Sequence, residues 1–310
     1  MKLFNIAIIG ECMVELQKKG DGLKQTFGGD TLNTALYLSR LTQSHGIRTS
    51  YITALGNDPF SADMLEKWQA EGIDTSLIPQ LKGKQPGLYY IETDDSGERC
   101  FHYWRSDSAA KYLFDQPDSP ALIEKLLQYD AVYLSGITLA ILTAIGRQVL
   151  FNFLEQYKAL DGKVFFDNNY RSKLWASRKQ AVDCYLKMLT FTDTALLTFD
   201  DEQELYGDIH VEHCIERTIN AGVKEIIIKR GSKDCLVVED QKAFYVAPTI
   251  VSNVVDTTAA GDSFSAGFLA KRFCGGDALE ASSSGHSLAG QVIQYSGAII
   301  PQNAMPNLSL

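Results

Sequence analysis

The stretch that decides the fold covers residues 254–272 and reads VVDTTAAGDSFSAGFLAKR. Apolar residues recur after position 263 at roughly helical spacing, which predicts that the small residues before them lie where a loop becomes a helix. The first turn of a helix leaves backbone N–H groups unpaired and carries the positive end of the helix dipole, so it attracts anions. Ala259, Ala260 and Gly261 are small enough to let a phosphate group reach those N–H groups. The stretch therefore predicts an anion hole at the start of a helix.

Asp262 comes directly after these small residues. A carboxylate beside an anion hole is repelled by the bound anion, so Asp262 is not expected to bind a phosphate itself. It fits instead a general base that takes the proton from a hydroxyl group attacking a phosphoryl group, while the anion hole holds the developing charge. The alternative is an acidic first turn on a buried helix, where an Asp is mildly stabilising. The residues alone leave both interpretations open.

Two runs resemble the signatures of a known family. DTTAAGDSFSAGF, residues 256–268, resembles the C-terminal signature of the PfkB, or ribokinase-like, carbohydrate kinases, with Ala259 where many members have Gly. FGGDTLNTALYLSRL, residues 27–41, is similar to the first signature of the same family. The resemblance extends over essentially the whole chain. It implies an ATP-dependent carbohydrate kinase, in which Asp262 is the base and Ala259, Ala260 and Gly261 form the anion hole.

The same resemblance implies the fold. It is an α/β fold of the ribokinase-like type, with a central, mostly parallel β-sheet flanked by helices on both faces. A small β-sheet forms a lid beside it. We expect a single ribokinase-like α/β domain over residues 1–310, with the lid built from segments near 11–26 and 86–106.

Composition agrees with a globular α/β protein. The 310 residues are 45% hydrophobic and 22% charged, which is enough apolar content for one large core. The net charge of −9 argues against a nucleic-acid partner. The apolar run at the N-terminus is too short for a secretory signal, and no stretch approaches the length of a membrane span. The six cysteines form no CxxC pair, so we expect reduced thiols and a cytoplasmic protein.

From residue 109 onward, apolar runs that suit strands alternate with runs that suit helices. This alternation predicts a parallel sheet with helices on both faces. Ligands bind such sheets outside the carboxyl ends of the strands. The segments expected at that edge are 135–136, 167–171, 198–202 and 229–234. The anion hole is expected to meet the same edge.

A Gly-Gly pair at 28–29 precedes an apolar stripe that predicts a helix from about residue 30. Asp30 or Thr31 is expected to cap this helix, and the glycines would let another molecule approach the backbone closely. From the residues alone, a plain turn is the commoner explanation of such a pair. The resemblance implies that Gly29, Asp30 and Asn33 line the sugar pocket.

Residues 87–105 are expected to form a β-hairpin, because two alternating runs flank the turn signal at 94–97. At a period of two, one face of the second strand would carry Arg99, Phe101, Tyr103 and Arg105. A small hairpin cannot bury a core alone, so it must pack on the rest of the chain. The resemblance implies that it forms the lid over the sugar. An ordinary edge hairpin is the alternative.

Arg171 follows a strand-like run and is a natural carboxylate or phosphate ligand, because its planar guanidinium matches those anions. With Arg105 as a second cation in the same pocket, the phosphate acceptor would be an acid. Three runs, IGECMVEL, PGLYYIETDDSGER and FDNNYR, narrow the resemblance to kinases of the sugar acid 2-keto-3-deoxy-D-gluconate. These phosphorylate its 6-hydroxyl and yield 2-keto-3-deoxy-6-phosphogluconate. The narrower resemblance implies that the acid is held by Gly29, Asp30, Asn33, Tyr89, Tyr103, Arg105 and Arg171.

Three other functions stay open. A fructokinase or ribokinase would share the fold and the base without needing both arginines. A nucleoside kinase would use Tyr89 and Tyr103 as an aromatic slot, with adenosine as the better acceptor. A non-catalytic sugar-acid sensor is the third, and the intact Asp262 speaks against it.

The resemblance also implies sites for ATP and Mg²⁺. The ATP-binding residues would be Asn169, Lys229, Gly231, Ser232, Lys233 and Asp234. The acidic run at 200–202 resembles a region that helps to hold magnesium, although the family's Asn is absent. Asp200, Asp201 and Glu202 are all candidates, Glu202 is the expected ligand, and acidic helix capping is the alternative. A monovalent cation is a further candidate cofactor. Because lid hairpins of this family often pair between subunits, we expect a homo-oligomer through the lid.

Overall fold

The predicted parallel strands form the centre of a large sheet. The computed structural model describes residues 3–20, 22–93 and 99–310. Eight strands are hydrogen-bonded in the order β12-β11-β10-β9-β8-β7-β1-β4. Their bounds are β1 (Phe4–Ile9), β4 (Ile47–Ile52), β7 (Ala131–Ser135), β8 (Lys163–Asp167), β9 (Thr194–Thr198), β10 (Glu225–Lys229), β11 (Cys235–Glu239) and β12 (Lys242–Val246). The strands from β10 to β4 run parallel, while β11 and β12 continue the sheet as antiparallel strands.

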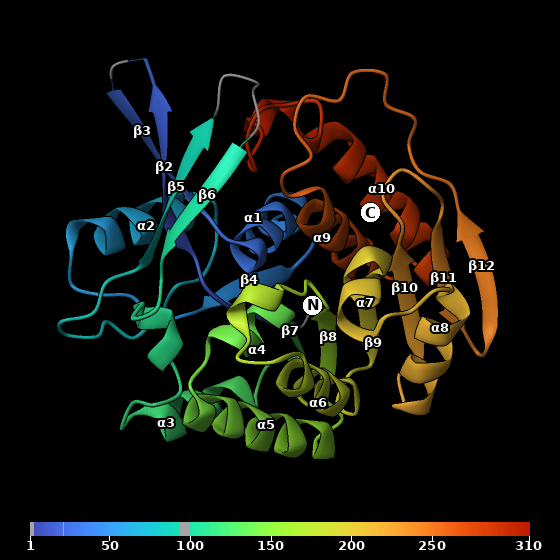
Figure 1. Ribbon diagram of the computed structural model, residues 1–310, viewed down its shortest axis with the longest axis horizontal. Coiled ribbons are helices and arrows are strands. Elements are labelled where there is room, and N and C mark those ends of the chain that lie inside the picture. The colour runs from blue at the N-terminus through green and yellow to red at the C-terminus, as the bar shows by residue number, and fades with distance from the viewer. Residues whose placement is uncertain (1–2, 21, 94–98) are drawn as a thin grey trace.

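Helices cover both faces of this sheet (Figure 1). One face carries α3 (Ser119–Leu126), α4 (Gly136–Ile141), α5 (Ala144–Ala159), α6 (Arg178–Leu189), α7 (Phe199–Tyr206) and α8 (Val211–Asn220). The other carries α1 (Asp30–Thr42), α2 (Pro59–Ala70), α9 (Ala260–Phe273) and α10 (Ala278–Val292). In β1, Ile6 and Ile8 pack toward the second set, while Ala7 and Ile9 pack toward the first. Strands buried on both faces read as continuous apolar runs, and the predicted fold class is confirmed.

A second sheet stands beside the large one, with its strands in the order β3-β2-β5-β6 (Figure 1). Its strands are β2 (Met13–Lys19), β3 (Gly22–Gly28), β5 (Gly87–Thr93) and β6 (Arg99–Trp104). β2 pairs with β5 in parallel, and the two outer pairs are antiparallel. The hairpin turn predicted at 94–97 lies outside the described residues. We call these strands the small sheet.

The two faces of the small sheet follow the predicted period of two, because alternate residues of a strand point to opposite faces. Tyr89 lies opposite Tyr103 in the β5–β6 register, with ring centroids 5.8 Å apart. Phe101 lies 6.3 Å from Tyr103 on the same face. On the opposite face, the rings of Tyr90 and His102 are 6.3 Å apart. The predicted sharing of one face by Phe101 and Tyr103 is confirmed.

The predicted cap of α1 was wrong. The helix has Gly29 as its N-cap residue, so its N-cap makes no side-chain hydrogen bond. The Asp30 side chain accepts a hydrogen bond from a distant loop instead, so tertiary contact has displaced the local cap. Short 3₁₀ turns complete the described chain: η1 (Ala109–Tyr112), η2 (Ser172–Leu174) and η3 (Gln302–Ala304). None of the helices in the described ranges is long and apolar enough to cross a membrane.

Candidate active site

The first turn of α9 holds the predicted anion hole. Ala259 is its N-cap residue, in the left-handed region with a φ of 62°. Glycine adopts this conformation without the steric cost that Cβ brings, which gives a physical reason for Gly at this position in many family members. The Ala260 N–H donates to the Thr257 carbonyl at 3.1 Å, so it is already engaged. Among the described residues, nothing accepts a hydrogen bond from the N–H groups of Gly261 and Asp262, which leaves these two donors for an anion.

Lys229, the last residue of β10, lies beside this turn. A Cβ built on Gly261 would be 3.7 Å from Lys229 Nζ. The ammonium pairs with Asp167, the last residue of β8, at 2.7 Å, and Asp167 also accepts from Ser265 Oγ at 2.8 Å. The pair is buried and joins the ends of two strands to α9. Sequence reasoning did not select Asp167 as a site residue, although an acid directly after a buried strand was the available signal.

Within the described part of the chain, Asp262 is held by α1 and forms no ion pair with a cation. Asn33 Nδ2 donates to its carboxylate Oδ2 at 2.8 Å, and Thr34 Oγ1 donates to its carbonyl at 3.2 Å. Although the residue keeps some accessible surface, burial of the carboxyl and the charge of Asp30 raise the pKa of Asp262 to about 7, against opposing effects of Asn33 and Lys229. A base with this pKa is partly ionised at neutral pH and takes up a proton readily.

Asp30 reaches the loop that follows β8. Asn169 Nδ2 donates to Asp30 Oδ2 at 2.7 Å, so a residue predicted for the sugar and one predicted for ATP are in contact. Asn33 Oδ1 is buried and has no hydrogen-bond partner in the described part of the chain. Because buried polar atoms are nearly always satisfied, this acceptor marks a position for a ligand donor.

The Gly-Gly pair lies at a place where the protein packs closely on itself. A Cβ on Gly28 would lie 2.3 Å from Tyr89 Oη, and a Cβ on Gly29 would lie 2.2 Å from the Glu11 carbonyl oxygen. The space beside each glycine is therefore filled by the protein itself. This packing alone requires glycine at both positions, and the approach of another molecule to the backbone here stays a prediction.

The segment that contains β2 contributes two acidic partners, Glu15 on the strand and Glu11 just before it, that the sequence analysis did not select. Tyr89 donates its hydroxyl to Glu15, which also accepts from Thr26 Oγ1 at 2.7 Å. Burial and the charge of Glu15 raise the pKa of the Tyr89 hydroxyl far above its usual range. Arg105 donates to Glu11, whose side chain is 1% exposed. The residues predicted to hold a substrate carboxylate and a sugar thus carry internal acidic partners.

Arg171 lies in the loop after β8, and 53% of its side-chain surface is exposed. Its Nη1 donates to the Tyr170 carbonyl at 2.6 Å and lies 3.4 Å from Asp201 Oδ1. Asp201 Oδ2 also accepts from the Tyr170 N–H at 3.1 Å. Burial raises the pKa of Asp201 to about 6, although Arg171 opposes that rise. Asp201 therefore lies at the same loop as the predicted anion ligands.

Glu202 has a closed environment. One carboxylate oxygen accepts from Asn168 Nδ2 at 2.9 Å, and the other pairs with Arg217 Nη2 at 2.6 Å. Its side chain is 2% exposed. The turn after β10 is the opposite case, because Gly231, Ser232 and Lys233 are exposed there.

The structure groups most of the predicted residues. One cluster surrounds α9 and contains Gly29, Asp30, Asn33, Asn169, Lys229, Ala259, Ala260, Gly261 and Asp262. A second contains Tyr89 and Tyr103 on the small sheet and Arg105 directly after β6. Arg171 lies with Asp201, whereas Arg105 pairs with Glu11. The α9 cluster combines a base, free helix N–H donors and a lysine, which together suit the transfer of a phosphoryl group to a hydroxyl.

Comparison with known proteins agrees with this chemistry. Residues 4–305 match the family described as pfkB family carbohydrate kinase. The chain is 52% identical over 305 residues to a 2-dehydro-3-deoxygluconokinase of Dickeya dadantii (strain 3937), which covers 97% of this chain and 98% of that protein. It is similar in fold to 2-dehydro-3-deoxygluconokinase from Thermotoga maritima, with a TM-score of 0.83 at 20% identity over 96% and 95% of the two chains. It is also similar in fold to a putative ribokinase II from E. coli in complex with ATP and Mg²⁺. The TM-score is 0.82 at 23% identity, and the match covers 99% of this chain and 97% of that chain. The chain belongs to the pfkB family of carbohydrate kinases.

Proposed function

We propose that the protein is an ATP-dependent kinase of 2-keto-3-deoxygluconate, also called 2-dehydro-3-deoxygluconate, and phosphorylates its 6-hydroxyl. One observation carries phosphoryl transfer, namely the carboxyl group of Asp262 in the first turn of α9. It accepts a hydrogen bond of 2.8 Å from Asn33, and its pKa is raised to about 7. The acceptor is proposed because a relative 52% identical over nearly the full chain is named 2-dehydro-3-deoxygluconokinase.

In this proposal, Asp262 takes the proton of the 6-hydroxyl while the hydroxyl oxygen attacks the γ-phosphorus of ATP. The bond from that phosphorus to the β–γ bridging oxygen breaks, and ADP leaves with its electron pair. The N–H groups of Gly261 and Asp262 and the ammonium of Lys229 would hold charge on the phosphoryl oxygens. The unpartnered Oδ1 of Asn33 would accept a sugar hydroxyl and orient it. The small sheet would act as a lid that excludes water.

The substrate carboxylate is proposed to meet Arg105 and Arg171. Arg171 is half exposed, and its contact with Asp201 is a single one at 3.4 Å. Arg105 Nε is buried without a partner among the described atoms. A bound carboxylate would supply the further acceptor that each guanidinium lacks. The remaining sugar contacts proposed are Gly29, Asp30, Tyr89 and Tyr103, and the ATP contacts are Asn169, Lys229, Gly231, Ser232, Lys233 and Asp234.

Mg²⁺ bound with ATP neutralises charge on the phosphate oxygens. Glu202 fits poorly as a direct ligand, because Asn168 and Arg217 already occupy its two carboxylate oxygens. Asp201 fits better, because its contacts, 3.1 Å to the Tyr170 N–H and 3.4 Å to Arg171, are longer than those of Glu202 at 2.9 and 2.6 Å. We therefore propose Asp201 for magnesium. A monovalent cation stays a proposal, and rates in potassium and in tetramethylammonium salts would test it.

The test is ADP release with ATP and Mg²⁺, comparing 2-keto-3-deoxygluconate with gluconate, fructose, ribose and adenosine at equal concentration. We expect a strong preference for the keto-deoxy acid, and the Asp262→Asn variant supplies the background rate. A preference for a neutral sugar or for adenosine would replace the proposed acceptor and keep the base. No release with any acceptor would favour the sensor.

We also propose a homo-oligomer that forms through the small sheet. Strands β3 and β6 are its edges, and edge strands tend to pair with another chain. The face opposite Tyr89 carries a groove of about 460 Å³, lined mainly by apolar side chains such as Leu16, Leu88 and Trp104. Trp104 is 62% exposed, so a second copy of the chain would cover it. Light scattering should show an oligomer that Trp104→Glu dissociates, and a monomeric wild type would contradict this.

A reducing compartment, the cytoplasm, is proposed from the cysteines. All six are free thiols in the structure, and Cys12, Cys184, Cys214 and Cys235 are buried. Buried free thiols suit a compartment that keeps cysteine reduced. Cell fractionation with an antibody to the protein would test this.

A further inference from the structure

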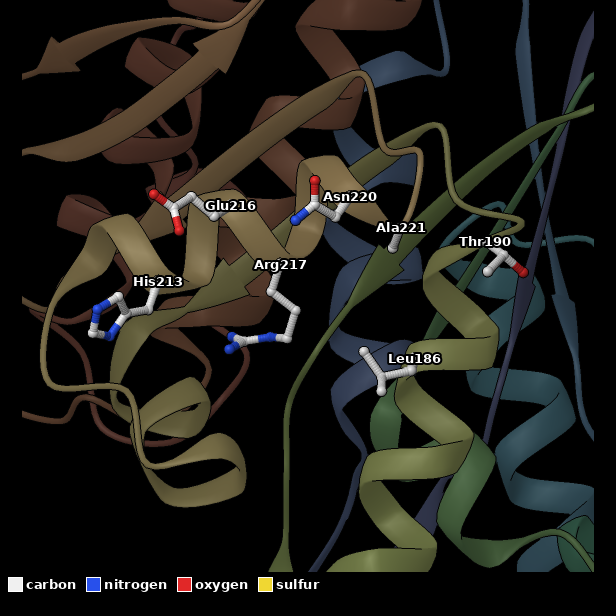
Figure 2. A pocket seen from close by; sticks show the side chains of 7 residues that line it. All are labelled: Leu186, Thr190, His213, Glu216, Arg217, Asn220 and Ala221. Atoms are coloured by element: carbon white, nitrogen blue, oxygen red, sulfur yellow. The ribbon is translucent and has the colours of Figure 1, made fainter.

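Arg217 of α8 holds both ends of α7. Its Nη2 pairs with Glu202 Oε2 at 2.6 Å in the first turn of α7, and its guanidinium pairs with both oxygens of Asp208 at 2.7 and 2.5 Å, just past Gly207. The guanidinium also lies 3.6 Å from the Tyr206 ring centroid. Figure 2 shows Arg217 on α8, in the wall of a surface groove that α6 lines on the other side. One cation thus fixes a helix of only 8 residues.

The other oxygen of Glu202 leads toward the candidate active site. Oε1 accepts from Nδ2 of Asn168, a side chain with no exposed surface. The same Nδ2 donates to the Thr198 carbonyl at 3.0 Å. Asn168 Oδ1 accepts from the N–H groups of Thr198 at 2.9 Å and of Asn169 at 2.8 Å. The polar atoms of the Asn168 side chain are therefore all satisfied, which fixes its orientation.

Asn169 is the residue that this arrangement supports. Its φ of 27° lies in the left-handed region, which a non-glycine residue adopts at a cost and keeps only where its surroundings enforce it. In this conformation its amide donates to Asp30 Oδ2 at 2.7 Å. A continuous series of contacts of 2.9 Å or less thus runs from Arg217 through Glu202, Asn168 and Asn169 to Asp30.

We propose that Glu202 and Arg217 are positioning residues for the kinase reaction: they fix Asn168, and Asn168 keeps Asn169 in the conformation that reaches Asp30. The proposal rests on the kinase function proposed above. Glu202 and Arg217 are not among the residues proposed to contact either substrate.

A metal at Glu202 is the competing interpretation. Glu202, Asp208 and Cys214 place possible ligand atoms within 4.8 Å of one another. The guanidinium of Arg217 already pairs with two of these three groups, so it supplies the positive charge that a metal would bring. Glu202 then belongs to the support of the 168–169 loop and does not bind magnesium.

The decisive variants are Glu202→Gln and Glu202→Ala. Gln keeps an oxygen that accepts from Asn168, so kcat should fall by no more than about threefold, whereas Ala removes the acceptor and should lower kcat about 10- to 100-fold, the usual effect of losing an orienting partner. The Mg²⁺ concentration for half-maximal rate should stay the same in both. A loss in either variant that excess Mg²⁺ restores would overturn the proposal, as would a wild-type kcat in Glu202→Ala.

Variants of Arg217 provide a second, independent test of the positioning role. Arg217→Lys keeps a cation and should recover part of the kcat that Arg217→Met loses. Equal losses in both would overturn the role assigned to the charge. Asp183→Ala on α6 is the matched control, because it removes an exposed acid from a surface ion pair. If Glu202→Ala fails to fold, Glu202→Gln and Arg217→Lys still decide between support and metal binding through their Mg²⁺ dependence.

Calorimetry with a non-hydrolysable ATP analogue, without any acceptor, separates this inference from the proposed function. Glu202→Ala is expected to weaken nucleotide binding about tenfold or more, because Asn169 is a proposed ATP contact and loses its support. Unchanged nucleotide binding would overturn the inference whatever the acceptor is. If the wild type instead binds nucleotide yet phosphorylates no sugar acid, the proposed function fails and the positioning role stands on binding alone.

Discussion

Two carboxylates in the first turns of α7 and α9 lie near the same edge of the sheet, and they have opposite surroundings. Glu202 touches the guanidinium of Arg217 at 2.6 Å. Among the described residues, the carboxylate of Asp262 accepts a hydrogen bond only from the amide of Asn33, because the nearby Lys229 makes its ion pair with Asp167. Burial raises the pKa of both carboxyls, yet Arg217 opposes this at Glu202 while a second carboxylate, Asp30, adds to it at Asp262.

This difference shows that the presence or absence of a cation partner determines what a buried carboxylate can do. A paired carboxylate keeps its charge and fixes the segments around it. A carboxylate without a direct cation partner exchanges its proton near neutral pH, which is the property that a general base needs. The proposals above assign structure to Glu202 and chemistry to Asp262 on this ground.

The largest expected effect is on turnover at Asp262. Asp262→Asn should lower kcat by a factor of about 10² to 10⁴, the scale of a lost general base. Binding of the sugar acid, measured by calorimetry, should persist, because the Asn side chain keeps an oxygen that accepts from Asn33. Asp183→Asn, an exposed acid on α6, is the matched control. A kcat close to wild type in Asp262→Asn would contradict the catalytic role proposed for Asp262 and so the difference drawn between it and Glu202.

Stability should show the reverse order. Arg217→Met leaves Glu202 and Asp208 buried without their cation, so urea denaturation should show a loss of about 3–5 kcal/mol in the free energy of unfolding. The control is Lys179→Met, which breaks a surface pair with Asp183 and should cost less than about 1 kcal/mol. Equal losses of unfolding free energy in the two variants would mean that the buried ion pairs stabilise the protein no more than a surface pair does.

The pH dependence tests the carboxylate without a direct cation partner. Because only ionised Asp262 accepts a proton and its pKa is about 7, kcat/KM should rise with pH and level off above neutrality. Asp30→Asn removes a charge that raises this pKa, so the rising limb should move to lower pH by about 0.5–1 unit. Lys229→Met should move it the opposite way. Profiles that coincide with wild type would contradict the assignment of the limb to Asp262.

The same shift predicts a sign for stability. Asp262 has a higher pKa in the folded protein than the value of about 3.9 expected for an unfolded Asp, so the folded state binds more protons between these values. Its contribution to the free energy of unfolding should therefore decline as pH rises from about 4 to 7. Asp262→Asn should flatten that decline in denaturation curves taken across this range, and an unchanged slope would contradict it.

The smallest expected effects are on stability, at Ala259 and Asn169, the two residues near these carboxylates whose backbone lies in the left-handed region. Ala259→Gly should raise the free energy of unfolding by about 0.5–1 kcal/mol, because glycine relieves the steric cost at a φ of 62°. Asn169→Gly should lower it, because the amide bound to Asp30 at 2.7 Å is lost. Thermal denaturation of both variants measures this, and a gain in both would show that the Asn169 contact adds nothing.

Local patterns foretold a large part of this molecule. The alternation of apolar runs predicted the covered parallel sheet, and a period of two placed Phe101 and Tyr103 on one face. The small residues at 259–261 predicted a helix start, which the structure has at Ala260. Such features depend on residues close together in the chain, whose spacing already states which side of an element is buried.

The hydrogen-bond and ion-pair partners of the site residues could not be predicted in this way, because they come from contacts between distant segments. Asn33 and Asp262 are 229 positions apart, and Lys229 and Asp167 are 62 apart. The order of the strands brings these pairs together, and no local spacing encodes that order. The same reason explains the missed Glu11, the absent side-chain cap of α1 and the Arg217 partner of Glu202. Sequence alone thus indicated which acids were candidates, and only the packing of distant elements decided which of them has a cation beside it.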